Sequence, residues 1–159
     1  MKKLKNHTLQ QYLISLSKKE PTPGGGSAAA LSGALGVSLL LMVAEYSVGR
    51  KTSRVDARLK TLIKRGSEVR DKLLEIVDRD AEAYLKVVQS RNKSLREKKT
   101  ALNRASRIPR DVCRLCYKAI DYAPYLVENG NQNLIADVQI GVELLYGAYQ
   151  SALTLTRQG

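Results

Sequence analysis

Residues 27–44 restrict the fold more than any other segment, because these 18 consecutive residues carry no charged side chain. A helix that crosses a membrane needs about 20 mostly apolar residues. Ten of these 18 are Ala, Ser or Gly, so their transfer into lipid would gain little. More than twenty mainly polar residues and a Pro-Gly segment precede the run, which does not fit a signal peptide. We therefore expect a cytoplasmic protein without membrane contact, in which residues 27–48 form a central, buried helix.

Hydrophobic residues in the rest of the chain recur at three- and four-residue steps, which predicts further helices. We expect these helices over residues 8–16, 53–91, 110–127 and 133–156. No alternating strand pattern appears between them. The sequence thus predicts an all-α fold, an antiparallel multi-helix bundle, with residues 1–159 as one domain.

Local signals predict where individual helices begin and end. Thr8 is a candidate N-cap for the first helix, and Asn133 for the last. Pro109 is expected to kink or break the chain, because proline cannot donate the helical hydrogen bond. The apolar residues of the first helix share one face: Leu9, Tyr12, Leu13 and Leu16.

The formal net charge is +12, which attracts polyanions through a long-range field. Residues 91–118 are the most basic part, with ten Lys or Arg. Nucleic acid, an anionic membrane surface and a polyanionic small molecule would each fit such a charge. The charge alone does not choose among them.

No residue pattern predicts a metal site. Cys113 and Cys116 form a single CxxC without a second pair, and the only histidine, His7, is far away in the sequence. No βαβ pattern accompanies the cysteines, so we interpret them as ordinary helix residues one turn apart. His7 is interpreted as a surface residue.

The segment Pro21–Ser27 is a candidate ligand site. Its prolines stop a helix and its glycines allow close approach of a ligand to the backbone. The N–H groups and the positive dipole end of the following helix would suit an anion. The sequence equally allows a purely structural role, in which the glycines only let the chain turn tightly.

Two acidic segments are also candidates. Asp137 lies on the same helical line as Ile140 and Leu144, so we expect apolar surroundings that prepare a carboxylate for general acid or base catalysis. Its alternative role is a first-turn acid stabilised by the helix N-terminus. Residues 78–82 contain three acids in five residues, and this spacing alone favours a solvated helix face.

Four blocks together resemble the formimidoyltetrahydrofolate cyclodeaminase and methenyltetrahydrofolate cyclohydrolase family. The blocks are Pro21–Ala30 followed by Gly33–Gly36 and Met42–Ala44, then Asp80–Tyr84, Ile108–Pro109 and Gly130–Asp137. Each block is weak alone, but their order and spacing cover nearly the whole chain. Glu45 and residues 151–155 depart from the family pattern.

This resemblance implies an all-helical homodimer that acts on a folate without a metal or redox cofactor. The reaction would be ring closure of 5-formimidoyltetrahydrofolate with release of ammonia, or hydrolysis of 5,10-methenyltetrahydrofolate. Asp137 is the expected catalytic residue. The expected substrate-binding residues are Pro23, Gly24, Gly25, Gly26, Ser27, Asp80, Asn131 and Asn133. Binding of a polyglutamylated folate would explain the basic surface, as would simple solubility.

Two alternatives follow from the same residues. Because of the departures, the chain could be a catalytically impaired relative that binds folate or serves as an interaction subunit. A basic helical nucleic-acid binder using residues 91–118 is the second alternative, although no nucleic-acid motif supports it and the chain lacks Phe and Trp for base stacking. The sequence does not separate deaminase from hydrolase activity.

Overall fold

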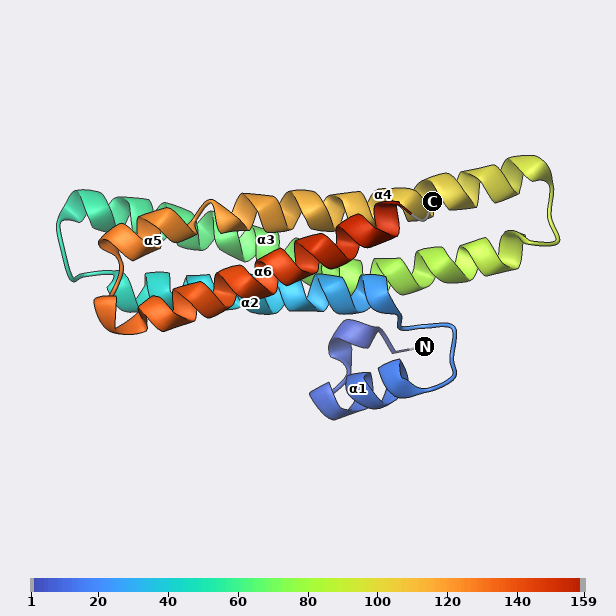
Figure 1. Ribbon diagram of the computed structural model, residues 1–159, viewed down its shortest axis with the longest axis horizontal. Coiled ribbons are helices and arrows are strands. Elements are labelled where there is room, and N and C mark those ends of the chain that lie inside the picture. The colour runs from blue at the N-terminus through green and yellow to red at the C-terminus, as the bar shows by residue number, and fades with distance from the viewer. Residues whose placement is uncertain (1, 158–159) are drawn as a thin grey trace.

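The computed structural model describes residues 2–157, and within them the chain forms helices and no strand. Figure 1 shows the long helices side by side. The α-helices are α1 (Leu9–Ser17), α2 (Gly25–Ser47), α3 (Ser53–Ser90), α4 (Leu95–Ile120), α5 (Ala123–Asn129) and α6 (Ile135–Thr156). Two short 3-10 helices, η1 (Leu4–Asn6) and η2 (Gln132–Leu134), complete the fold. The predicted all-α class is confirmed.

Four long helices, α2, α3, α4 and α6, form an antiparallel bundle. α2 packs against α3 and α6, and α4 closes the bundle on the other side against the same two helices. The C-terminal end of α3 and the N-terminal part of α4 extend beyond the other helices as a two-helix arm (Figure 1). α1 and η1 form an N-terminal segment that lies beside the start of α2 and outside the bundle.

α2 is the central helix, as its small residues predict. Gly36 lies so close to α6 that an added Cβ would be 2.7 Å from the Gly141 carbonyl oxygen. By length and composition α2 could cross a membrane, with a mean hydropathy of 2.0, but 61% of that window is buried inside the bundle. The packing thus explains its apolar sequence as that of a core helix.

The first helix begins where the sequence predicts, but it buries little of its apolar face. Thr8 caps α1 through a reciprocal pair of hydrogen bonds with Gln11, as expected. However, Tyr12 is the only buried residue of α1, while Leu9 and Leu13 are 78% and 60% exposed. The shared apolar face of α1 is therefore mostly open to solvent, and Tyr12 alone is buried.

Two predicted helix ends were wrong. Pro109 does not break the chain, since α4 runs through it with the proline ring buried, and the interruption comes at residues 121–122 instead. Packing of α4 against α3 and α6 offsets the hydrogen bond that proline cannot make. Asn133 is not the N-cap of α6; the Asn131 side chain accepts the Asn133 N–H and caps η2.

Candidate functional site

A carboxylate from α3 lies against the first turn of α2. Oδ2 of Asp80 accepts the backbone N–H of Ser27 at 3.0 Å. The N-cap position of α2 is Gly24, whose missing side chain cannot accept a hydrogen bond from the helix. Asp80 thus takes over, from another helix, the role of an N-cap acceptor.

Glycine at position 26 makes room for this carboxylate. A Cβ on Gly26 would overlap the carboxyl group of Asp80, whereas a Cβ on Gly24 or Gly25 would meet nothing within 4 Å. Pro23 is buried beneath the loop, and Gly25 is exposed. Of the predicted binding residues, the structure therefore brings Pro23, the three glycines, Ser27 and Asp80 together.

The surroundings of Asp80 favour its protonated form. Burial raises the pKa of the Asp80 carboxyl above its ordinary value, and the hydrogen bond from Ser27 offsets part of the rise. Oδ1 has no hydrogen-bond partner among residues 2–157. A half-buried carboxyl with one oxygen held and the other free has the properties of a general acid or base.

The N-terminal segment contacts this region at two points. The Tyr12 hydroxyl and Ser27 Oγ are 2.9 Å apart, and both residues are buried. Asp78 accepts the Lys5 backbone N–H at 3.3 Å and is only 7% exposed. The acids of residues 78–82 are therefore not a solvated helix face; Glu82 is exposed, but Asp78 is buried and Asp80 is hydrogen-bonded.

The predicted residues at the start of α6 lie at the other end of the bundle. Gly141 faces Gly36, and the Asn131 N–H donates to the Ser47 hydroxyl near the end of α2. Asp137, one turn before Gly141, thus lies roughly 20 Å along α2 from Ser27 at 1.5 Å per residue. Asp137 is half-buried, and the Asn133 side chain is exposed. Within one chain the structure does not bring Asp137 to the glycine loop.

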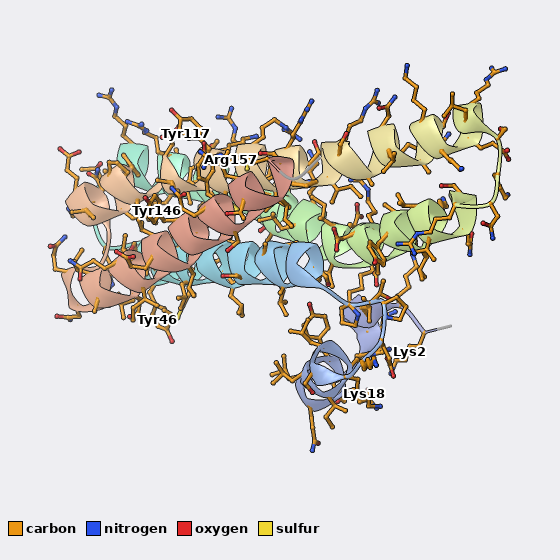
Figure 2. The ribbon with its side chains drawn as sticks, turned by 45° about the vertical axis from the view of Figure 1, so that its right-hand side comes forward. Lys2, Lys18, Tyr46, Tyr117, Tyr146 and Arg157 are labelled. Carbon is orange, nitrogen blue, oxygen red and sulfur yellow. The ribbon has the colours of Figure 1, made fainter. Side chains whose placement is uncertain are left out.

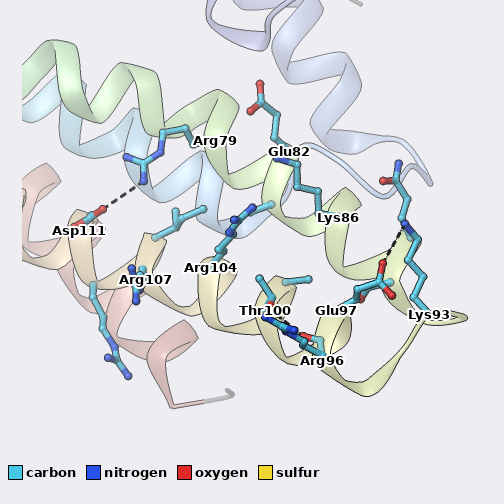
Figure 3. Close-up of a pocket in the computed structure, with 16 residues that line it drawn as sticks. Arg79, Glu82, Lys86, Lys93, Arg96, Glu97, Thr100, Arg104, Arg107 and Asp111 are labelled. Carbon is cyan, nitrogen blue, oxygen red and sulfur yellow. Dashed lines mark hydrogen bonds and ion pairs between the residues drawn. The ribbon is translucent and has the colours of Figure 1, made fainter.

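A basic groove begins within one turn of Asp80 and follows the two-helix arm (Figure 3). It measures about 900 Å³ and lies between α3 and α4. Ion pairs join Arg79 to Asp111 at 3.6 Å and Lys93 to Glu97 at 3.8 Å. Within the described chain, the remaining cations of the groove have no ion pair: Lys86, Arg96, Arg104, Arg107 and Arg110. The groove is a surface suited to a multiply charged anion.

The other candidate side chains form no site. Cys113 and Cys116 are free thiols on α4, and burial raises the pKa of Cys116 to about 12, so it stays protonated. They are ordinary helix residues, as predicted. Among residues 2–157 no three His, Cys, Asp or Glu side chains are grouped so as to hold a metal ion.

Sequence reasoning missed Tyr12 as part of the site. Its spacing with Leu9 and Leu13 indicates only an apolar helix face. The Tyr12–Ser27 contact joins two helices across the proline-glycine segment, and no local pattern encodes it. Asp80 was found through the family resemblance rather than through spacing.

Comparisons with known proteins agree with this geometry. The sequence pattern of the formiminotransferase-cyclodeaminase family matches residues 8–157. A methenyltetrahydrofolate cyclohydrolase of Methylorubrum extorquens is 35% identical over 92% of this chain and 76% of its own length. The rat formimidoyltransferase-cyclodeaminase is 24% identical, and the match spans only 30% of that longer protein.

The fold is shared with a solved relative. The crystal structure of a formiminotetrahydrofolate cyclodeaminase from Thermotoga maritima superimposes with a TM-score of 0.92 at 27% identity, over 97% of this chain and 78% of that one. The helical bundle is thus shared with this relative. The chain belongs to the formiminotransferase-cyclodeaminase family.

Proposed function

We propose that this protein is an enzyme of folate one-carbon metabolism that acts at the carbon between N5 and N10 of tetrahydrofolate. The reaction is cyclodeamination of 5-formimidoyltetrahydrofolate or hydrolysis of 5,10-methenyltetrahydrofolate. The observation that carries the proposal is the Asp80 carboxyl, held against the first turn of α2 beside the glycine loop. Family membership supports the same reaction class.

Both reactions need a group that moves a proton and tolerates positive charge. In cyclodeamination, N10 adds to the formimidoyl carbon, and ammonia leaves as the ring closes. In hydrolysis, water adds to the amidinium-like carbon and the ring then opens. A carboxylate can take the proton from the attacking group, return one to the leaving nitrogen, and stabilise the cation. Neither reaction transfers electrons, so the proposal includes no redox cofactor.

Asp80 suits this role because of its protonation. A raised pKa brings the carboxyl closer to the working pH, where one group can both accept and donate a proton. The Ser27 N–H fixes one oxygen and leaves the other for substrate. Glycines at positions 24 and 25 keep the approach open, since no side chain covers the loop there.

We include a homodimer in the proposal, formed through the outer face of α2 and α6. Leu35 and Tyr46 on α2 are 52% and 61% exposed, and Ile140 on α6 is half exposed. Tyr46 projects from this outer face in Figure 2. Glu45 is the only charged residue of α2, although the whole chain has a net charge of +12. A largely apolar face whose helices carry no Lys or Arg, on so basic a protein, suits a second copy of itself.

Two-fold symmetry would then complete the site. A two-fold axis across α2 places the α2 helices of two copies antiparallel, so that the start of one lies near the end of the other. Because the start of α6 lies near the end of α2, Asp137 of one copy approaches the glycine loop of its partner. This arrangement gives Asp137, and Asn131 beside it, the site role that the sequence predicts.

The basic groove would hold the tail of a polyglutamylated folate. It begins beside Asp80 and offers several cations without an ion pair. None of its lining residues is aromatic, so it lacks the stacking surface that single-stranded nucleic acids use. Lys86→Glu should raise KM for a polyglutamylated substrate and leave KM for the monoglutamate unchanged; equal KM changes for both would contradict a tail site. Lys60→Glu, an exposed cation on α3 outside the groove, is the control.

The deciding experiment is turnover of both folates by the wild-type protein and by Asp80→Asn. Turnover of one compound, lost in the variant while the protein stays folded, supports the proposal and names the reaction. Saturable folate binding without turnover of either compound would instead favour an impaired, binding relative. A cytoplasmic location is part of the proposal, and the two free thiols are consistent with it.

A further inference from the structure

Tyr12 is the one residue through which α1 enters the interior of the protein. It is 5% exposed, and every other residue of α1 is exposed or half-buried. Its hydroxyl lies 2.9 Å from Ser27 Oγ, which is fully buried. A buried tyrosine needs a hydrogen-bond partner for its hydroxyl. The partner here belongs to the same residue whose backbone N–H holds Asp80.

Ser27 therefore makes two contacts, and together they link Tyr12 to Asp80. Its side chain meets Tyr12, and its backbone N–H donates to Asp80 Oδ2. Burial raises the pKa of the Tyr12 hydroxyl, the hydrogen bond to Ser27 offsets part of this rise, and the negative charge of Asp80 adds to it.

A second contact holds the N-terminal segment on the other side of Asp80. The Lys5 backbone N–H donates to Asp78, two residues before Asp80 on α3. The segment 5–17 therefore connects the start of α2 with the part of α3 that carries the carboxylate. Figure 2 shows this segment next to the bundle.

We propose that Tyr12 is a positioning residue for Asp80, and that residues 5–17 belong to the reaction site through it. This inference rests on the proposed function. Tyr12 does not touch the reacting carbon in this proposal. Its hydroxyl fixes the Ser27 side chain, which keeps the first turn of α2 oriented so that the Ser27 N–H points at Asp80. Without that anchor the carboxyl is held less well at the distance that proton transfer requires.

Tyr12→Phe tests the inference, because the ring still fills its buried place while the hydroxyl is lost. We expect kcat to fall about tenfold, a part of the roughly 10²–10⁴-fold that a positioned acid or base contributes. KM should change little, since the hydroxyl contacts no substrate. Tyr117→Phe removes a hydroxyl from an exposed tyrosine on α4 and is the matched control. It should leave kcat unchanged.

A second readout does not depend on turnover. The Ser27 amide proton donates to Asp80, so its NMR chemical shift should move as Asp80 ionises. We expect this pH-dependent movement to shrink to less than half in Tyr12→Phe and to stay unchanged in Tyr117→Phe.

Ser27→Ala should give the same loss of kcat as Tyr12→Phe, and the double variant should be no worse than either single one.

The outcomes separate this inference from the proposed function. A wild-type kcat, or a wild-type Ser27 movement, in Tyr12→Phe would overturn the positioning role. Additive losses in the double variant would also overturn it, because Tyr12 and Ser27 would then act independently. If no variant and no wild-type protein turns over either folate, while Tyr12→Phe still loses the Ser27 movement, the folate reaction is rejected and the link between Tyr12 and Asp80 stands.

Discussion

Asp80 and Asp137 are two carboxylates beside the first turns of two helices, yet their surroundings differ. Asp137 belongs to the first turn of its own helix, α6, and no residue of the described chain is hydrogen-bonded or ion-paired to its side chain. Asp80 comes from the C-terminal part of α3 and reaches the first turn of α2, where Ser27 donates to it and Gly26 leaves it space. Burial raises the pKa of Asp80.

A position in the sequence does not by itself prepare a carboxylate for catalysis. Both acids lie in helices and both have apolar neighbours in the sequence. Only Asp80 lies between two helices, where water is partly excluded and a fixed N–H is present. In the single chain, the surroundings of Asp80 therefore favour proton transfer, whereas Asp137 would join that site only through the second copy of the proposed dimer.

The largest expected effect is that of Asp80→Asn. The amide keeps the size of the side chain but cannot exchange a proton in the required way, so kcat should fall about 10²–10⁴-fold. Steady-state turnover of the preferred folate measures the loss, with circular dichroism as the check on folding. A loss smaller than threefold would show that Asp80 is not the acid or base of the reaction. Asp137 would then be the better candidate for that role.

The next prediction tests whether Asp137 acts across a dimer. Asp137→Asn should lower kcat by about tenfold or more if Asp137 takes part in the reaction. Mixing it with Asp80→Asn under conditions of subunit exchange should restore about a quarter of wild-type activity, because half of the dimers would contain one intact site of two.

Leu35→Glu provides the control for subunit exchange. It places a charge on the proposed apolar face, so it should yield a monomer in size-exclusion chromatography with light scattering, and mixing should then restore nothing. No recovery in dimers that demonstrably exchange would place Asp137 outside the partner's site.

Gly26→Ala should give a smaller loss. The added methyl group overlaps the Asp80 carboxyl and has to displace it, which costs about 1–3 kcal/mol of stability by the usual effect of overpacking. Chemical denaturation measures this cost. Gly25→Ala is the matched control, since its Cβ would meet nothing within 4 Å and its stability should not fall. Equal stabilities of the two variants would mean that Asp80 is not held against α2.

The smallest expected effect concerns the dependence of stability on pH. The pKa of Asp80 is higher in the folded state than in the unfolded state, so the folded state retains the proton up to a higher pH. Ionisation of Asp80 therefore lowers the free energy of unfolding as pH rises from the unfolded pKa through the folded pKa. Below both pKa values the group is protonated in both states and does not change stability. Asp80→Asn should thus match the wild-type Tm at acidic pH and exceed it by a few degrees near neutrality. A variant that is less stable than the wild type at neutral pH would contradict the sign.

The sequence predicted much of the fold, because helical periodicity and capping are local. The central helix was predicted over residues 27–48 and found at Gly25–Ser47, and Ser53–Ser90 agrees with the predicted 53–91. Pro109 was misjudged, since its cost to the helix is local but the packing that offsets it comes from α3 and α6. Leu9 and Leu13 lie on a predicted apolar face yet are exposed, because periodicity identifies such a face without telling what covers it.

Part of the candidate site can likewise be predicted from the sequence, and the rest cannot. The glycine loop and the buried central helix follow from residue types alone, since small side chains and a missing charge restrict what the segment can do. The juxtaposition of Tyr12, Ser27 and Asp80 is decided only by the tertiary structure. These residues lie 15 and 53 positions apart, and the contacts between them depend on how α1, α2 and α3 pack. Hydrogen bonds between distant helices leave no periodic pattern in a sequence, whereas helix formation does.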